Sequence, residues 1–146
     1  MSYFTNITSL FGVKKGGKSH IKNLLEVAAA DGKFLEVEES LLFAIAKRNN
    51  ITKNQIAEIR KSSPQVEFTM PKDDREKFLH LYELVHMMLI DKHIHEEEFR
   101  LCEAFAVKFG YRSDAAKEII NAIKSNIENE NGPDETMKRI SFFIKE

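Results

Sequence analysis

The feature that most constrains this chain is the helical spacing of its apolar residues, which recur every three or four positions in almost every segment. Such spacing places an apolar stripe along one face of an α-helix. Only SSPQVEFTMP, residues 62–71, alternates like a strand, and its bounding prolines favour an extended linker instead. The pattern predicts an all-α fold, a compact bundle of seven or eight helices with no sheet. The clearest stripes are Ile21/Leu24/Leu25/Ala28, Leu41/Leu42/Ile45, Phe78/Leu81/Tyr82/Val85/Leu89, Phe99/Cys102/Ala106/Phe109 and Ala116/Ile119/Ile120/Ile123/Ile127.

The composition matches an ordinary soluble domain and argues against several classes of protein. Of the 146 residues, 42% are hydrophobic and 31% are charged, and the net charge is −1, whereas nucleic-acid-binding domains usually carry a strong basic excess. No apolar run approaches the roughly 20 residues of a transmembrane helix. The one cysteine, Cys102, cannot form a disulfide within the chain and lies on an apolar stripe, so we expect it to be buried. These features predict a cytoplasmic protein that binds no nucleic acid.

Residues 12–19, GVKKGGKS, fit the pattern G-x-x-x-x-G-K-[ST] of the loop that binds nucleotide phosphates. Residues 87–91, MMLID, are similar to the strand that helps to hold magnesium in such enzymes. A phosphate loop works by joining a parallel strand to a helix, and no partner strand is predicted here. We therefore interpret MMLID as the end of a helix. We interpret GVKKGGKS as a flexible connector, with Ser19 as the N-cap of a helix that begins near His20.

The residues before this connector are predicted to form a short helix of their own. Their apolar members have helical spacing, and these are Tyr3, Phe4, Ile7, Leu10 and Phe11. We expect this helix to pack on the bundle, although an apolar face followed by lysines could also contact an anionic membrane surface. The predicted organisation is an N-terminal helical arm with a Gly/Lys connector over residues 1–17, and a helical domain over residues 18–146.

The chain contains an internal repeat with an offset of 60 residues. Residues 31–38, DGKFLEVE, align with residues 91–98, DKHIHEEE, and both read D-x4-E-x-E. The alignment continues on both sides, and its pairs include His20/His80, Leu24/Leu84, Leu41/Leu101, Ala44/Ala104, Ala46/Ala106, Glu58/Glu118 and Ile59/Ile119. Each half would contain a helix, a short acidic turn and two further helices. We therefore expect a bundle of two pseudo-symmetric three-helix repeats.

The two acidic turns are the candidate functional site. Asp31 and Asp91 lie where a helix is expected to end, and Glu38 and Glu98 lie near the third position of the next helix. One interpretation is structural, in which each aspartate accepts hydrogen bonds from its turn and each glutamate reaches back to cap its helix. In the other interpretation the carboxylates converge on a divalent cation, and oxygen ligands alone would suit calcium or magnesium.

At these turns the sequence resembles a known family. Residues 28–47, AAADGKFLEVEESLLFAIAK, resemble the first half of the tellurite-resistance TerB-like domain, and residues 88–111, MLIDKHIHEEEFRLCEAFAVKFGY, resemble its second half. The helical domain at the N-terminus of the membrane-anchored DnaJ-like co-chaperones is a relative. The resemblance covers roughly residues 18–146 and implies a compact all-helical bundle with a role in bacterial stress. It also implies candidate metal ligands, which by position are Asp31, Glu38, Asp91 and Glu98. Lys92 departs from the family pattern, because glycine is usual there.

Two functional hypotheses follow from these features. The first is a non-enzymatic TerB-like interaction or sensor module of bacterial stress response, which recruits an unidentified protein partner and holds a divalent metal at the paired acidic turns. The second is a metal-dependent hydrolase that uses the same carboxylates together with His93 and His95. These two histidines would favour zinc at the second turn. A filled oxygen shell would favour the module, whereas an open coordination position carrying water would favour the enzyme.

Overall fold

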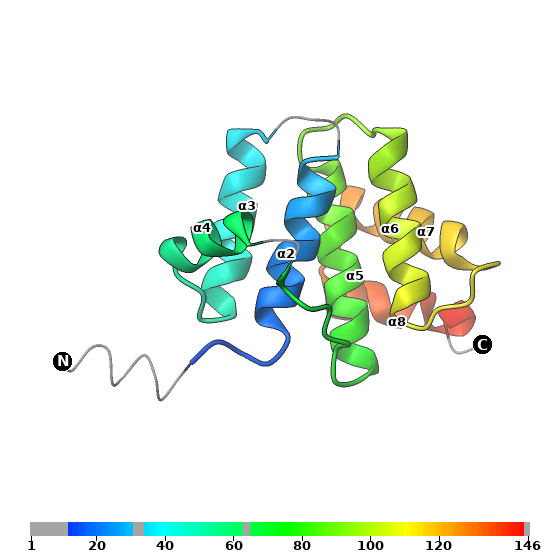
Figure 1. Ribbon diagram of the computed structural model, residues 1–146. Helices are drawn as coiled ribbons and strands as arrows, with labels where there is room; N and C mark the ends of the chain where they lie inside the picture. Colours follow the sequence, from blue (N-terminus) through cyan, green and yellow to red (C-terminus); the bar gives the residue numbers. More distant parts are fainter. Residues whose placement is uncertain (1–11, 31–33, 63–64, 145–146) are drawn as a thin grey trace.

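The computed structural model describes residues 12–30, 34–62 and 65–144, and these residues form seven α-helices and no strand. The helices, labelled as in Figure 1, are α2 (Gly17–Ala28), α3 (Glu36–Arg48), α4 (Lys53–Lys61), α5 (Asp74–Leu89), α6 (Glu96–Lys108), α7 (Ala116–Glu128) and α8 (Pro133–Ile144). The all-α prediction is confirmed for this part of the chain. MMLID, residues 87–91, is the end of α5 and the turn that follows it, as predicted.

Helix α5 is the centre of the bundle (Figure 1). It contacts α2, α3, α6, α7 and α8. Helices α2 and α5 lie side by side, with α3 and α4 packed on the α2 side and α6, α7 and α8 on the α5 side. Most of the 16 residues of α5 are buried, including the polar residues His80 and Glu83. A helix enclosed in this way must find partners for its polar side chains inside the protein.

The predicted apolar stripes meet in one core. The largest fully buried side chains are Phe78, Phe109, Ile21, Leu24, Leu42, Leu81, Leu84, Met87, Met88, Ile119, Ile120 and Ile123. Cys102 is completely buried in α6, as predicted. Burial, with smaller contributions from Glu98 and Glu103, raises the pKa of its thiol. Because the thiolate is the reactive form of cysteine, this side chain is suited to packing and not to nucleophilic attack.

Local capping signals set the starts of two helices. Thr52 caps α4, since its hydroxyl accepts a hydrogen bond from the Gln55 backbone N–H at 3.1 Å. The Gln55 side chain in turn accepts one from the Thr52 N–H at 2.8 Å. Asp73 caps α5 by accepting a hydrogen bond from the Glu76 N–H at 2.9 Å. Each cap satisfies backbone N–H groups that have no partner within the helix, so it marks where the helix begins.

The GVKKGGKS string leads directly into α2, and the described residues contain no strand that it could join. Helix α2 begins at Gly17, and the predicted N-cap at Ser19 is wrong. Gly16 precedes the helix with a left-handed backbone, φ 80°, which favours glycine. A Cβ on Gly17 would lie 3.3 Å from the Asn49 Cβ, so this glycine permits close packing. Ser19 lies in the first turn instead, and its hydroxyl accepts a hydrogen bond from the Thr69 N–H at 2.9 Å.

The predicted linker contains no helix or strand at residues 66–70. Its Phe68 stacks on Phe109 with ring centroids 6.0 Å apart, and the Lys108 ammonium lies 4.1 Å from the centroid of the Phe68 ring. The linker is therefore held against the C-terminal end of α6. The predicted N-terminal helical arm falls largely on residues 1–11, which lie outside the described part of the chain. Among the described helices, none has both the length and the apolar character that crossing a membrane requires.

The enclosure of α5 predicts that two side-chain truncations will differ in their effect on the unfolding free energy. Leu84 is fully buried in α5. The substitution Leu84→Ala should lower the unfolding free energy by roughly 2–5 kcal/mol, because it leaves a cavity that is surrounded by other helices. Val107 on α6 is 44% exposed, and Val107→Ala should change the unfolding free energy by about 0.5 kcal/mol or less. Urea unfolding of both variants measures the difference. Equal effects would contradict the central position of α5.

Candidate functional site

The helices that flank the two predicted acidic turns meet at the same end of the bundle. Helices α2 and α5 end there, and α3 and α6 begin there, at the top of Figure 1. Asp31, the first aspartate, lies outside the described residues. The other predicted site residues are described, and they are Glu38, Asp91, His93, His95 and Glu98.

The two glutamates are helix caps. The Glu38 Oε1 accepts a hydrogen bond from the Leu35 N–H at 2.8 Å. The Glu98 Oε1 accepts the equivalent bond from the His95 N–H at 3.3 Å. Both side chains are almost completely buried, at 1% and 0% exposure. The structural interpretation of these two residues is therefore confirmed, since each carboxylate reaches back three residues to a backbone N–H at the start of its helix.

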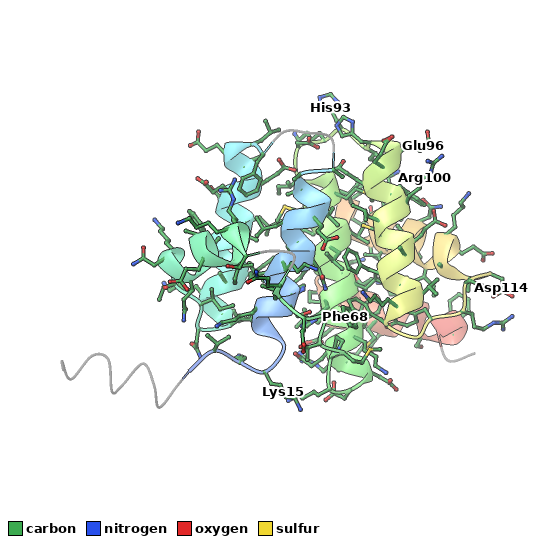
Figure 2. The ribbon with its side chains drawn as sticks, viewed as in Figure 1. Lys15, Phe68, His93, Glu96, Arg100 and Asp114 are labelled. Atoms are coloured by element: carbon green, nitrogen blue, oxygen red, sulfur yellow. The ribbon has the colours of Figure 1, made fainter. Side chains whose placement is uncertain are left out.

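The second turn is closed by its aspartate. The Asp91 Oδ1 accepts a hydrogen bond from the His93 N–H at 3.0 Å, which is the pattern of an Asx turn. Lys92 between them has a left-handed backbone, φ 67°, a conformation that glycine adopts more readily than lysine. Figure 2 shows His93 at the top of the bundle, exposed to solvent. His95 is half-buried at the N-cap of α6.

The described part of the chain brings no three histidine, cysteine, aspartate or glutamate residues together in a group suited to a metal ion. Glu38 and Glu98 each use one carboxylate oxygen in a cap, and Asp91 uses one in its turn. These residues do not assemble a metal site by themselves. A cation at this end of the bundle would need further ligands, and Asp31 is the candidate that the repeat supplies.

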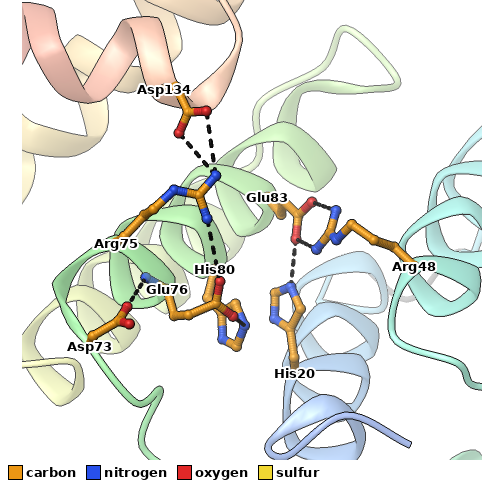
Figure 3. Close-up of polar contacts among 8 residues, drawn as sticks. All are labelled: His20, Arg48, Asp73, Arg75, Glu76, His80, Glu83 and Asp134. Carbon is orange, nitrogen blue, oxygen red and sulfur yellow. Dashed lines mark hydrogen bonds and ion pairs between the residues drawn. The ribbon is translucent and has the colours of Figure 1, made fainter. Parts of the chain in front are cut away.

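A second polar cluster, which sequence reasoning missed as a unit, lies inside the bundle between α2, α3 and α5 (Figure 3). At its centre is Glu83 of α5. The Glu83 Oε1 accepts hydrogen bonds from the His20 Nε2 at 2.9 Å and from the Arg48 Nη2 at 2.7 Å. The Arg48 Nη1 donates to the other oxygen, so the guanidinium binds the carboxylate through two parallel bonds. Because an ionised carboxylate only accepts, the His20 Nε2 carries its proton.

The two histidines of the cluster stack on each other. The ring centroids of His20 and His80 are 3.8 Å apart and the rings are 5° from parallel. These residues are a pair in the 60-residue repeat, so the alignment contained the signal that relates them. The repeat does not reveal the ion pair, because the counterpart of Glu83 is Asn23 and that of Arg48 is Lys108. No local pattern links three residues that come from three different helices.

The charges of the cluster are set by burial and by the ion pair. Burial alone would raise the pKa of Glu83, but hydrogen bonds from Arg48 and His20 outweigh it and lower the pKa to about 2. The same hydrogen bond raises the pKa of Arg48. Burial, together with the charge of His20, lowers the pKa of His80 to about 3. At neutral pH, Glu83 and Arg48 are therefore ionised and His80 is neutral.

Neighbouring contacts on α5 extend this polar region towards α8 (Figure 3). The Glu76 Oε1 lies 3.8 Å from the His80 Nε2. The Arg75 Nη2 lies 3.2 Å from the Asp134 Oδ1 of α8, on the exposed edge of the bundle. The donors and acceptors of this region are largely used in contacts within the protein. These contacts tie α2, α3 and α8 to α5.

No family model matches this chain, and no curated protein and no solved structure matches it. The TerB-like resemblance therefore rests on the residues of the sequence that carry it, above all the two acidic turns.

The depressed pKa of His80 predicts a pH dependence of stability. Folded His80 stays neutral down to a pKa of about 3, whereas the unfolded chain takes up a proton near its ordinary value of 6.5. Its contribution is therefore fully present above pH 6.5 and is lost as the pH falls towards 3, with a slope of up to about 1.4 kcal/mol per pH unit. Urea unfolding at several pH values should show a shallower loss in His80→Gln than in the wild type. Parallel curves would show that His80 protonates normally when folded.

The ion pair predicts a second effect, which depends on Glu83. Arg48→Met leaves a buried carboxylate without its guanidinium, and since the Arg48 side chain is 42% exposed the change should cost roughly 1–3 kcal/mol of unfolding free energy at neutral pH. In a Glu83→Gln background the same change should cost much less, because no buried charge is left behind. The control is Arg100→Met, since Arg100 pairs with Glu96 on the surface and such pairs contribute about 1 kcal/mol or less. Additive effects of the Arg48 and Glu83 changes would contradict the coupling.

Proposed function

We propose that this chain is a non-enzymatic helical interaction or sensor module of the TerB-like kind, acting in bacterial stress response in the cytoplasm and built from two related halves. One observation carries the proposal: the helices that flank the two acidic turns meet at one end of the bundle, where α2 and α5 end and α3 and α6 begin (Figure 1). Helix α3 spans Glu36–Arg48 and α6 spans Glu96–Lys108, with the offset of 60 that the repeat has. Each begins with a buried glutamate that caps it.

The ends of the same two helices also correspond. The Ile51 N–H donates to the Ala46 carbonyl at 2.9 Å, and 60 residues later the Tyr111 N–H donates to the Ala106 carbonyl at 3.0 Å. Left-handed backbone follows both helices, at Asn50 with φ 60° and at Gly110 with φ 105°. These matched starts and ends support two halves of common design, in which a change at one turn can alter the angle between neighbouring helices.

Three residues with catalytic potential, Cys102, His20 and Arg48, are buried or held by structural partners, which supports a non-enzymatic role. Cys102 is fully buried with a raised thiol pKa. His20 and Arg48 are bound to Glu83. The hydrolase hypothesis requires three protein ligands around a metal with an open position for water. No group of that kind exists among the described residues, and no observation favours the hydrolase over the module.

A divalent cation shared by the two turns is the second part of the proposal. The paired position of the turns supports it, because Asp31 follows α2 in the sequence as Asp91 follows α5. Carboxylate oxygens at both turns would suit calcium or magnesium, and the exposed imidazole of His93 would shift the preference towards zinc. Such a cation would draw the two turns together, and its release would loosen that end of the bundle.

Calorimetric titration of metal-free protein with calcium, magnesium, manganese and zinc tests this part of the proposal. We expect micromolar binding of at least one ion in the wild type and at least a tenfold weaker affinity in the Asp31→Asn, Asp91→Asn double variant, because both charged ligands are lost. The matched control is Asp114→Asn with Asp134→Asn, which removes the same charge from exposed positions outside the turns. No heat with any ion, or equal binding by both double variants, would refute the shared cation site.

A further inference from the structure

We infer that the groove between the GVKKGGKS string and the extended segment 66–70 binds an extended, acidic segment of a partner protein. The inference rests on the proposed interaction role but not on the cation, because the groove lies at the other end of α2 from the acidic turns (Figure 1). The groove has a volume of about 470 Å³, within the range of small-ligand and peptide-binding pockets. It is lined by Val13, Lys14, Gly16, Lys18, Ser19, Gln65, Val66, Glu67 and Thr69.

The walls of the groove are held in place by hydrogen bonds. On one side, the Lys14 N–H donates to the Asn49 carbonyl at 3.1 Å, which fixes the string against the end of α3. Across the groove, the Thr69 N–H donates to the Ser19 hydroxyl at 2.9 Å and fixes the extended segment to α2. Gly16 lies beside Thr69, and a Cβ there would approach its methyl group at 3.7 Å. The groove is therefore built before any partner arrives, which lowers the entropy lost on binding.

The charge of the groove favours an acidic partner. Lys14 and Lys18 line it together with one carboxylate, Glu67, so that lysines outnumber acids in the lining, and Lys15 lies between the two lysines in the sequence; all four side chains are exposed. Figure 2 shows Lys15 below the start of α2. Elsewhere Lys22 pairs with Glu26 at 3.2 Å, but no carboxylate among the described residues forms an ion pair with these three lysines. The first turn of α2 contains no acidic residue, so its positive helix dipole adds to the lysine charges.

The backbone of the extended segment favours a partner that is itself extended. Within the described chain, no backbone–backbone hydrogen bond joins residues 66–70 to another residue. Pro71 follows the segment and is buried. Because proline has a fixed φ and no backbone N–H, it separates the extended segment from α5. The Thr69 N–H is bound to Ser19, and a peptide lying along the segment can pair with the remaining backbone N–H and C=O groups, as in recognition by strand addition. The lysines then bind carboxylates that project from the peptide.

Apolar side chains on and near the same segment would contact alternate side chains of that peptide. Val13 and Val66 are half-buried and line the groove. Met70, the last residue of the extended segment, is 45% exposed. Figure 2 shows Phe68 on the segment that crosses in front of α2 and α5, where Lys108 covers its ring. A peptide that alternates acidic and apolar residues matches this surface, because successive side chains of an extended chain point to opposite sides.

A screen of short random peptides displayed on phage tests the inference against the full chain, with Lys14→Glu, Lys18→Glu as the variant. Peptides selected by the wild type should be enriched in Asp and Glu. By fluorescence anisotropy the selected peptides should bind the variant about tenfold more weakly, since two attractive charges become repulsive. The matched control is Lys117→Glu, Lys138→Glu, which makes the same charge change at exposed positions on α7 and α8 and should leave the affinity unchanged.

Circular dichroism establishes that both variants are folded, and the exposed side chains make that the expected result. Failure to select peptides, selection without an acidic excess, or equal binding by the wild type and the groove variant would each overturn the inference. Micromolar ATP binding that is lost in the groove variant would also overturn it and would assign the groove to a nucleotide. Peptide binding is measured without added metal, so its outcome is distinguishable from that of the cation titration.

Discussion

The enclosure of α5 by other helices is the constraint on which the rest of the structure depends. A helix with apolar contacts on most sides provides the centre of the core, but its polar side chains then lose access to water. Glu83 is the critical case, because a buried carboxylate without a partner would be strongly destabilising. Arg48 and His20 solve this problem from two different helices. The ion pair therefore specifies how α2 and α3 are placed around α5, in addition to neutralising a charge.

The acidic residues that suggested a metal site have several distinct tasks. Glu38 and Glu98 are buried caps at the starts of two helices, and Asp91 closes the turn before one of them. At the second turn these tasks explain the spacing from Asp91 to Glu98 without a ligand, since a turn and a helix start both need acceptors for backbone N–H groups. A cation would add to this framework and would not replace it. The cap is local, whereas a shared cation would couple the two halves.

Both ends of the bundle expose charges of both signs, with Lys92 at the end where α5 stops and Asp73 and Asp74 at the end where it starts. The end that contains the two turns exposes Glu36, Glu96 and Glu97. The opposite end of α2 exposes Lys14 and Lys18 beside an open groove. Net charge alone says little about what such a chain can bind.

The sequence by itself determined the helices, the Thr52 cap and the extended linker, because apolar period and capping act between residues a few positions apart. It offered caps at Glu38 and Glu98 as one of two interpretations, and the structure shows both caps. Only the tertiary structure decided that Ser19 binds the linker and does not cap α2. It alone brought together the cluster around Glu83, whose partners are 35 and 63 residues away. Contacts over such separations depend on how helices pack, and local spacing does not encode that packing.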